Sequence, residues 1–501
     1  MRSRVARAFK RAAVFVAASI LTLLAVRAYD AQRGPPLERW HTFVPHELRA
    51  EQLDRSDWNA YLRAEDAAFE AVRAEVSAKL DATDGPLNRY YEGSPVYPGH
   101  LPQDWNRSFV LEPDGAPRGA AVLLHGLTDS PYSMREVARL YRAKGYVAIA
   151  IRLPAHGTVP GALTDVDWQD WSAATRLAVR EACRRAGGPL PLHLVGYSNG
   201  GALALQYALE ALDDRALARP DRVVLISPMI GVTAFARFAG PAGWPSIFPA
   251  FAKAAWLAIL PEFNPFKYNS FPINAARQTH LLTAALQRQI ARQSRQGRLA
   301  DLPPILTFQS AIDFTVSTQA VVSALYDRLP ANGSELVLYD LNRSAHFGAL
   351  LRPSFDAVLS RLLPAPPRSF RSTILTNASP ATSEVVERVT DAGGSSERSR
   401  ELGLSYPDDV FSLSHIALPF APDDPLYGTQ PDPAEDFGIR LGTLAKRGER
   451  GALIISLDSL LRMTSNPFFA YQMGRIGEVI DAGTADVPGS AATTAKSGCL
   501  R

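Results

Sequence analysis

The chain has 501 residues, of which 47% are apolar and 21% charged, with a formal net charge of +3. This balance is typical of a globular protein with a large core, and we expect one main domain with additions. The first eleven residues contain five basic and no acidic residues, which is more positive charge than the whole chain carries net. The remaining chain therefore has no net positive charge, and nothing in it favours nucleic acid as a partner. The cysteines, Cys183 and Cys499, have no metal-ligand spacing, and we expect neither a structural disulfide nor a zinc site.

The amino terminus has the pattern of an export signal. The basic cluster is followed by AAVFVAASILTLLAV (12–26), an uncharged apolar run with the length of a signal-peptide core. Val26-Arg27-Ala28 offers a cleavage site, but an uncleaved signal-anchor fits residues 1–28 equally well. In both cases the basic residues stay cytoplasmic and the remaining chain is exported. We therefore expect a membrane-anchored protein whose main domain lies on the extracytoplasmic side.

The next segment, 29–104, is expected to be a polar, proline-containing tether followed by one amphipathic helix. In 56–80, apolar residues recur at intervals of three and four, which predicts that helix. From 105 to 363, apolar strands such as VLLHG, YVAIAIRLP, LHLVG and RVVLISP alternate with helical stretches. Strands that are apolar throughout and are each followed by a helix predict a mostly parallel sheet with helices on both faces.

Three later segments depart from this alternation. Residues 229–302 are rich in aromatic residues and proline, end in a polar helix, and are too long for an ordinary connection, so we expect a lid that forms an acyl pocket. Residues 364–480 are expected to be a C-terminal extension packed on the main domain. The small-residue segment 481–501 is expected to be a disordered tail.

Between the strand LHLVG and the following apolar helix lies GYSNGG, which places Ser198 at a sharp strand-to-helix turn. A G-x-S-x-G pattern alone is weak, and a plain tight turn is the alternative. Here, however, the pattern follows a buried strand and opens a helix, the arrangement that exposes a nucleophilic serine at the edge of a sheet. The flanking glycines leave room for the strained serine backbone.

Upstream, HGLTDSPYSM begins at His125, where another strand ends. Acyl transfer needs two backbone N–H groups directed at the oxyanion that develops on the substrate. Asn199, which follows the serine, can supply one of them, and Leu127 the other.

Together, HGLTDSPYSM, RLPAHGT (152–158), DWQDW (167–171) and GYSNGG resemble the α/β-hydrolase superfamily. Over residues 105–350 the chain is most similar to its monoglyceride-lipase and serine-aminopeptidase-like branch, in a membrane-anchored bacterial form. Ala155 departs from the glycine usual in that branch. The resemblance implies an α/β-hydrolase fold with a helical lid, and loop-shaping roles for His125 and His156.

A serine nucleophile needs a base, which a carboxylate orients, and in this fold the order along the chain is serine, acid, histidine. The strand in PPILTFQSAID ends at Asp313, which we expect to be the acid, with a helix cap as the alternative. Asp327 and Asp340 fit less well, because one lies in a helix and the other inside a strand.

Two histidines compete for the role of the base. His346 follows a strand at the usual distance from Asp313 and precedes a helix. His415 lies far later, in SLSHIALPFAPDDPLYG, a block that prolines stiffen and aromatic residues can anchor. This block resembles segments of the membrane-anchored bacterial relatives, and the late helix NPFFAYQMGRIGEVI resembles the helix that closes the fold, so His415 is preferred. Residues 342–405 are then an insertion.

The sequence thus predicts a serine hydrolase that cleaves carboxylic esters with lipid-like or medium acyl chains through an acyl-enzyme intermediate. It implies no metal and no organic cofactor. The alternatives are a catalytically silent hydrolase fold that serves as a binding or scaffold protein of the cell envelope, and a serine peptidase or amidase.

Overall fold

In the computed structural model, residues 2–231, 246, 249–344, 351–353, 357–444, 455–482 and 498–499 are described. Their helices are α1 (Arg2–Arg33), α2 (Arg39–Thr42), α3 (Ala50–Arg55), α4 (Trp58–Glu75), α5 (Arg135–Ala143), α6 (Trp168–Ala186), α7 (Asn199–Asp213), α9 (Ile273–Arg295), α10 (Thr318–Ala320), α12 (Val358–Leu362), α13 (Leu457–Arg462) and α14 (Phe469–Ala482). The strands are β1 (Phe109–Leu111), β2 (Gly119–Leu124), β3 (Tyr146–Ile151), β4 (Leu192–Tyr197), β5 (Arg222–Ile226), β6 (Trp256–Ala258), β7 (Phe271–Pro272), β8 (Ile305–Ser310), β9 (Glu335–Tyr339), β10 (Arg371–Asn377), β11 (Glu384–Thr390) and β12 (Glu397–Ser405).

Ten of these strands form one sheet within the described residues, in the order β1-β3-β2-β4-β5-β8-β9-β10-β11-β12. The central strands from β3 to β10 are all parallel, whereas β1, β11 and β12 pair antiparallel at the two edges. Most of the central strands are buried along their whole length, as expected for a parallel sheet covered on both faces. The predicted mostly parallel α/β sheet is confirmed.

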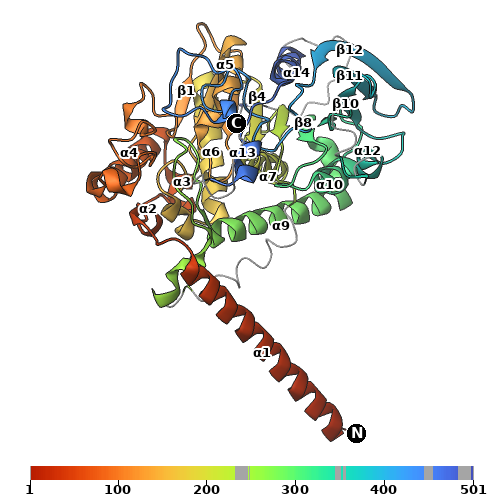
Figure 1. The fold of residues 1–501 in the computed structure, drawn as a ribbon. Coiled ribbons are helices and arrows are strands. Elements are labelled where there is room, and N and C mark those ends of the chain that lie inside the picture. Colours follow the sequence, from red (N-terminus) through yellow and green to blue (C-terminus); the bar gives the residue numbers. More distant parts are fainter. Residues whose placement is uncertain are drawn as a thin grey trace.

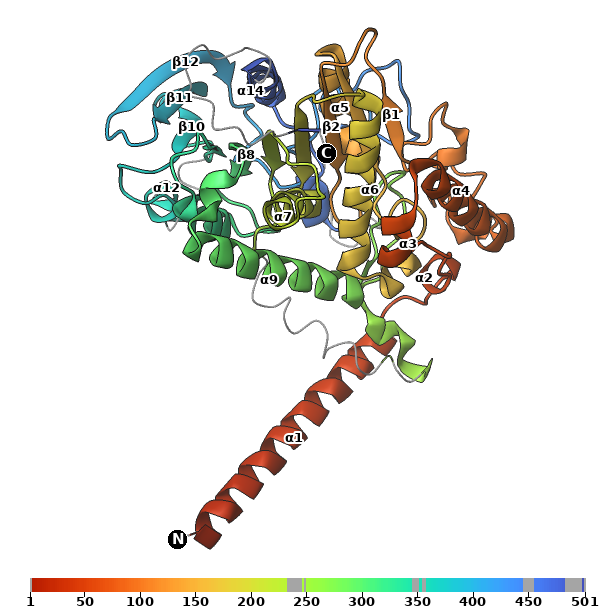
Figure 2. The same ribbon diagram turned by 180° about the vertical axis from the view of Figure 1, so that it is seen from behind.

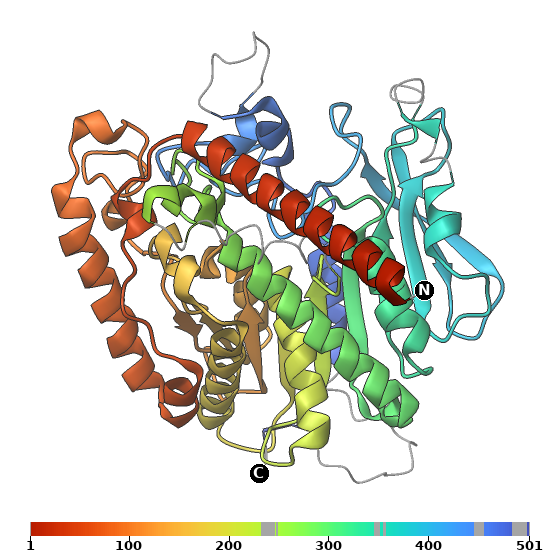
Figure 3. The same ribbon diagram turned by 90° about the horizontal axis from the view of Figure 1, so that it is seen from below.

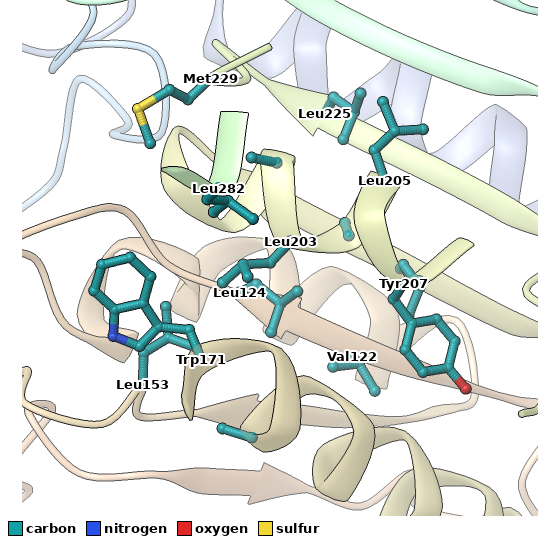
Figure 4. Close-up of a cluster of buried hydrophobic side chains, with 14 of the residues drawn as sticks. Val122, Leu124, Leu153, Trp171, Leu203, Leu205, Tyr207, Leu225, Met229 and Leu282 are labelled. Atoms are coloured by element: carbon teal, nitrogen blue, oxygen red, sulfur yellow. The ribbon is translucent and has the colours of Figure 1, made fainter. Parts of the chain in front are cut away.

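The two faces of the sheet carry separate hydrophobic cores, because alternate residues of each strand point to opposite sides. On one face, Val122 and Leu124 of β2 pack with residues of α6, α7 and α9, including Trp171, Leu203 and Leu282 (Figure 4). On the other face, Ala121 and Leu123 pack with α5 and α14. Figure 2 shows α6, α7 and α9 together on one side of the sheet.

The C-terminal extension belongs to this second core. Its buried residues include Tyr406, Leu413, Leu418, Phe420, Leu426, Tyr427, Phe468, Ile476 and Ile480. Asp424 accepts hydrogen bonds from Tyr132 (2.8 Å) and Arg135 (3.3 Å) of the segment after β2, and all three side chains are buried. The extension also adds β10, β11 and β12 to the main sheet, so it packs as an integral layer of the fold.

The segment 29–104 departs from the prediction, because its first part packs on the domain instead of forming a free tether. Trp40 and Leu53 are buried in the first core, and α3 lies against α6. Arg152, buried after β3, makes ion pairs with Glu47 (2.8 Å) and Glu65 (3.0 Å) of this segment. The predicted amphipathic helix is α4, which Figure 3 shows at the opposite side of the domain from the β11–β12 hairpin.

The N-terminal helix α1 projects away from the domain (Figure 1). Its span Phe9–Asp30 has a mean hydropathy of 1.9 and is almost unburied, so it is long and apolar enough to cross a membrane or to act as a signal sequence. The end of α1 packs against residues 249–258 of the predicted lid, where Arg27 donates to the carbonyl of Trp256. Lys253 donates to the carbonyl of Gly34 at 2.9 Å.

The expectation that the cysteines are unbridged is wrong. Cys183 on α6 and Cys499 form a disulfide with a Cα–Cα distance of 4.9 Å. Beside it, Cys499 N–H donates to the carbonyl of Leu190 at 3.2 Å. The far end of the predicted disordered tail is therefore attached to the domain, while 483–497 lie outside the described residues.

Candidate active site

Ser198 lies at the turn between β4 and α7, with φ 54° and ψ −114°, a backbone conformation that non-glycine residues rarely adopt. The glycines around it are required by space. A Cβ at Gly200 would come within 2.0 Å of the carbonyl oxygen of Leu124, and one at Gly196 within 2.2 Å of the carbonyl oxygen of Gly200. The G-x-S-x-G pattern is therefore the sequence that this close packing of β2, β4 and α7 permits.

Three predicted side chains, which come from distant parts of the chain, meet at this turn. The Oγ of Ser198 lies 3.0 Å from Nε2 of His415, and Nδ1 of the same ring lies 2.8 Å from Oδ2 of Asp313. Because Asp313 accepts from Nδ1–H, Nε2 is left to accept from the serine hydroxyl. This is the geometry of a nucleophile, a base and an orienting carboxylate.

Hydrogen bonds hold both carboxylate oxygens of Asp313. Oδ1 accepts from the backbone N–H groups of Thr315 (2.7 Å) and Val316 (3.0 Å), and Oδ2 also accepts from Nε2 of Gln309 (3.1 Å). Burial alone would raise the pKa of Asp313, but the attraction of His415 and these hydrogen bonds together hold it below its ordinary value. Asp313 is thus kept ionised and in one orientation.

The path of the chain explains how His415 reaches this position. After β9 the chain leaves for β10, β11 and β12, and it returns beside its point of departure. Asn342 donates from its backbone N–H to the carbonyl of Phe411 (2.9 Å) and from its side chain to that of Val410 (3.0 Å). The segment between Asn342 and Val410 is thus an excursion, and the loop that follows it carries His415. The other candidate, His346, lies outside the described residues.

The predicted oxyanion groups lie at the ends of two neighbouring strands. A Cβ on Gly126 would be 3.4 Å from that of Ser198, so the loop containing Leu127 passes directly beside the serine. Thr128, with φ 61°, turns this loop sharply, and its carbonyl accepts from Tyr268 N–H at 2.7 Å. Among the described residues, the backbone N–H groups of Leu127 and Asn199 have no partner, which leaves both free for an oxyanion.

The other two histidines of the motifs are buried and support loops. Nε2 of His125 accepts from Leu153 N–H at 3.0 Å, and Nδ1 donates to the carbonyl of Gly126 at 2.9 Å. Burial lowers the pKa of His125 and lowers that of His156 to about 4, so both are neutral. Neither is bonded to Ser198.

Sequence reasoning missed two residues that support the site. Gln309, on β8, donates to Asp313, and the hydroxyl of Tyr197 donates to the carbonyl of His415 at 3.3 Å. A glutamine within a strand expected to be buried was a usable signal for Gln309. Nothing comparable in the sequence marks Tyr197. Among the described residues no group of three or more His, Cys, Asp or Glu is arranged to hold a metal ion.

A cavity of about 780 Å³ lies beside His415. Its lining includes Ile312 and Phe314, which flank Asp313, residues 409–415, Gly442 and Leu444, and residues 458 and 460–464. The described part of the predicted lid, 229–302, contributes no residue to it. Residues 232–245 and 247–248 of the predicted lid lie outside the described residues.

Comparison with curated proteins finds a thermostable monoacylglycerol lipase of Bacillus sp. (strain H-257), 31% identical over 90 residues. That match covers 17% of this chain and 34% of the relative, so the chain spans about a third of the length of the protein it matches.

Solved structures similar to this chain include a soluble variant of monoglyceride lipase from Saccharomyces cerevisiae, at 12% identity and a TM-score of 0.37, which covers 46% of this chain and 81% of that one. A monoacylglycerol lipase from Paleococcus ferrophilus is 15% identical with a TM-score of 0.34, over 51% and 97% of the two chains. Similarities at this level say nothing about substrate.

The family model described as "Alpha/beta hydrolase family" matches residues 121–401, which is more than half of the chain. The matched range includes the Ser198 turn, the loop containing Leu127 and Asp313, whereas His415 lies beyond it. The chain therefore belongs to the alpha/beta hydrolase family.

Proposed function

We propose that this protein is a serine hydrolase that cleaves carboxylic esters through an acyl-enzyme intermediate. The observation that carries the proposal is the chain of contacts from Ser198 Oγ through His415 to Asp313, at 3.0 and 2.8 Å. The partial similarity to a monoacylglycerol lipase supports an ester as substrate.

In the proposed reaction, His415 Nε2 takes the hydroxyl proton of Ser198 as Oγ attacks the ester carbonyl. Asp313 holds the imidazole in the required tautomer and stabilises the imidazolium that forms. The N–H groups of Leu127 and Asn199 bind the oxyanion. His415 then protonates the leaving alcohol, and water, activated by the same imidazole, releases the acid and regenerates the serine hydroxyl.

A fluorophosphonate probe and p-nitrophenyl esters test this proposal. The wild-type protein should be labelled and turn over ester, and Ser198→Ala should abolish both while thermal unfolding stays that of a folded protein. His415→Ala should lower turnover by about 10³-fold or more, as loss of a triad base does.

Three outcomes would contradict the proposal. Undiminished turnover by Ser198→Ala would exclude Ser198 as the nucleophile. Loss of activity in His346→Ala but not in His415→Ala would return the role of the base to His346. A folded protein without labelling or turnover would favour the alternative of a binding or scaffold protein, and a preference for peptide substrates would favour a peptidase.

We further propose that α1 anchors the protein in a membrane with the hydrolase domain on the extracytoplasmic side. The exposed apolar span Phe9–Asp30 and the basic residues before it support this orientation. The Cys183–Cys499 disulfide supports it independently, since structural disulfides persist in oxidising compartments. Tagged protein should sediment with membranes, be released on deletion of residues 1–28, and be digested by protease added outside the cytoplasm; a cytosolic full-length protein would refute the anchor.

A further inference from the structure

The cavity beside His415 is built mainly by the C-terminal part of the chain. One wall is formed by Ile312 and Phe314, which flank Asp313; most of the remaining lining comes from residues 409–415, from Gly442 and Leu444, and from 458 and 460–464. At about 780 Å³ it falls within the range of about 300–1,000 Å³ that small-molecule sites occupy. The C-terminal extension, whose role the sequence left open, therefore encloses a space that reaches the proposed base.

Apolar side chains are concentrated at this cavity even though they are open to solvent. Four of its lining residues are exposed large hydrophobics: Phe314 (80% exposed), Leu461 (66%), Phe411 (49%) and Leu444 (44%). Outside α1, the other described residues of this kind are Val44, Phe251, Leu257, Leu260 and Leu281, and none of them lines the cavity. Because a soluble surface rarely gathers such residues, the cluster indicates a groove for an apolar ligand.

Hydrogen bonds and buried leucines hold part of the groove wall in place. The hydroxyl of Ser414 donates to the carbonyl of Arg462 at 2.8 Å, and the guanidinium of Arg462 donates to the hydroxyl of Thr315 at 2.5 Å. Leu413 and Leu460 anchor the same segments in the interior, with exposed fractions of 1% and 3%. The exposed side chains of Phe314, Phe411 and Leu461 therefore lie close in sequence to residues that are anchored to the interior or to each other.

The positive and negative charges of the residues that line the groove cancel. Asp409 and Asp458 are acidic, and Arg352 and Arg462 are basic, so the groove has no formal net charge when His415 is neutral. A neutral chain suits such a groove better than a charged peptide does.

We propose that this groove holds the acyl chain of the ester, so that the C-terminal extension, in addition to any lid, sets the substrate class toward esters with medium or long acyl chains. The inference rests on the proposed function. Burial of each additional methylene is worth about a fourfold gain in binding. Chain-binding energy that also fixes the carbonyl at Ser198 raises kcat/KM with acyl length until the groove is filled.

The test uses the full-length protein in lipid nanodiscs, since detergent tails would compete for the groove. The ratio of kcat/KM for p-nitrophenyl octanoate to that for the acetate is measured in the wild type, in Leu461→Asp and in Val44→Asp. Val44 is the control, because it is an exposed apolar residue that lies outside both the groove and the predicted lid. Fluorophosphonate labelling shows in each variant that the site is intact.

We expect a wild-type octanoate-to-acetate ratio of about ten or more, and a fall of at least about fivefold in that ratio for Leu461→Asp, because the new carboxylate must be desolvated beside the chain. Val44→Asp should keep the wild-type ratio. A flat dependence on acyl length in an enzyme that cleaves acetate, or equal ratios in the two variants, would overturn the groove while leaving the proposed function intact. Failure of the proposed function looks different, because no ester of any length is then cleaved.

Discussion

Replacing Asp313 by asparagine changes one charge and one hydrogen-bond pattern at the site while keeping the shape of the side chain. Oδ1 accepts from the backbone N–H groups of Thr315 and Val316, so the amide oxygen of the asparagine must occupy this position. The amide nitrogen then takes the place of Oδ2, which lies 2.8 Å from Nδ1 of His415. A donor now faces the Nδ1–H donor.

The size of the effect follows from the response of the ring. Its proton moves to Nε2, so that Nδ1 can accept from the new amide. Nε2–H then points at Ser198 Oγ, 3.0 Å away, and no longer accepts the serine proton. Loss of the correct tautomer in a triad of this kind costs about 10⁴-fold in kcat, or about 5.4 kcal/mol in the activation free energy.

Steady-state hydrolysis of p-nitrophenyl butyrate measures this change, and thermal unfolding verifies that the variant is folded. The control is Asp327→Asn, because Asp327 is exposed and lies in a neighbouring turn away from the site; its kcat should stay within about twofold of the wild type. If folded Asp313→Asn keeps more than about a tenth of the wild-type kcat, the assignment of Asp313 as the orienting acid is wrong.

Three further predictions concern the frame of the site. Cys499→Ser removes a bridge between residues separated by 316 positions, and loop entropy gives a loss of up to about 6 kcal/mol in the free energy of unfolding, measured as a drop of several degrees in Tm. Wild-type protein in reductant should show the same drop, and an unchanged Tm would contradict a structural role for the disulfide. Gly200→Ala should abolish turnover and lower Tm, because its Cβ would lie 2.0 Å from the Leu124 carbonyl oxygen. The control Gly474→Ala, in open space on α14, should stabilise the protein by about 0.5–1 kcal/mol, and equal effects of the two changes would refute the packing argument. Glu65→Ala should lower stability by about 3 kcal/mol by leaving the buried Arg152 one partner short, and a change below about 1 kcal/mol in urea unfolding would show that Glu47 compensates.

The parts of the fold that could be predicted are those that local sequence specifies. The apolar strands, the helices between them and the Ser198 turn each depend on residues within a short window, and the short contacts that a Cβ would make at Gly196 and Gly200 explain why glycine stands at both positions. Ala155 has φ 68°, in the left-handed region that glycine adopts without strain, so the backbone here suits the glycine that the family resemblance led us to expect.

The parts that could not be predicted depend on contacts between distant segments. Neither Cys183 nor Cys499 has a neighbour in sequence that hints at the bridge, and only the fold places α6 beside the end of the chain. In the segment 29–55, Trp40 and Leu53 were too few to suggest burial in a polar, proline-containing stretch. The packing of Leu53 depends on the surface of α6, and that of Trp40 on Tyr90, on which its ring stacks.

The choice between His346 and His415 depended on two different signals, and the preference for His415 came from the resemblance of the block around it and not from its spacing along the chain. Spacing along the chain favours His346, because a histidine a few residues after the strand next to the acid is what the fold normally provides. Position in space follows a different rule: the loop after β9 need only end beside Ser198 and Asp313, whatever the length of chain inserted into it. Since Val410 and Phe411 return to bond with Asn342, the excursion through β10, β11 and β12 restarts the loop where it was interrupted. A base supplied after that return can meet the same serine and the same acid, and the segments that carry it become free to build a substrate groove of their own.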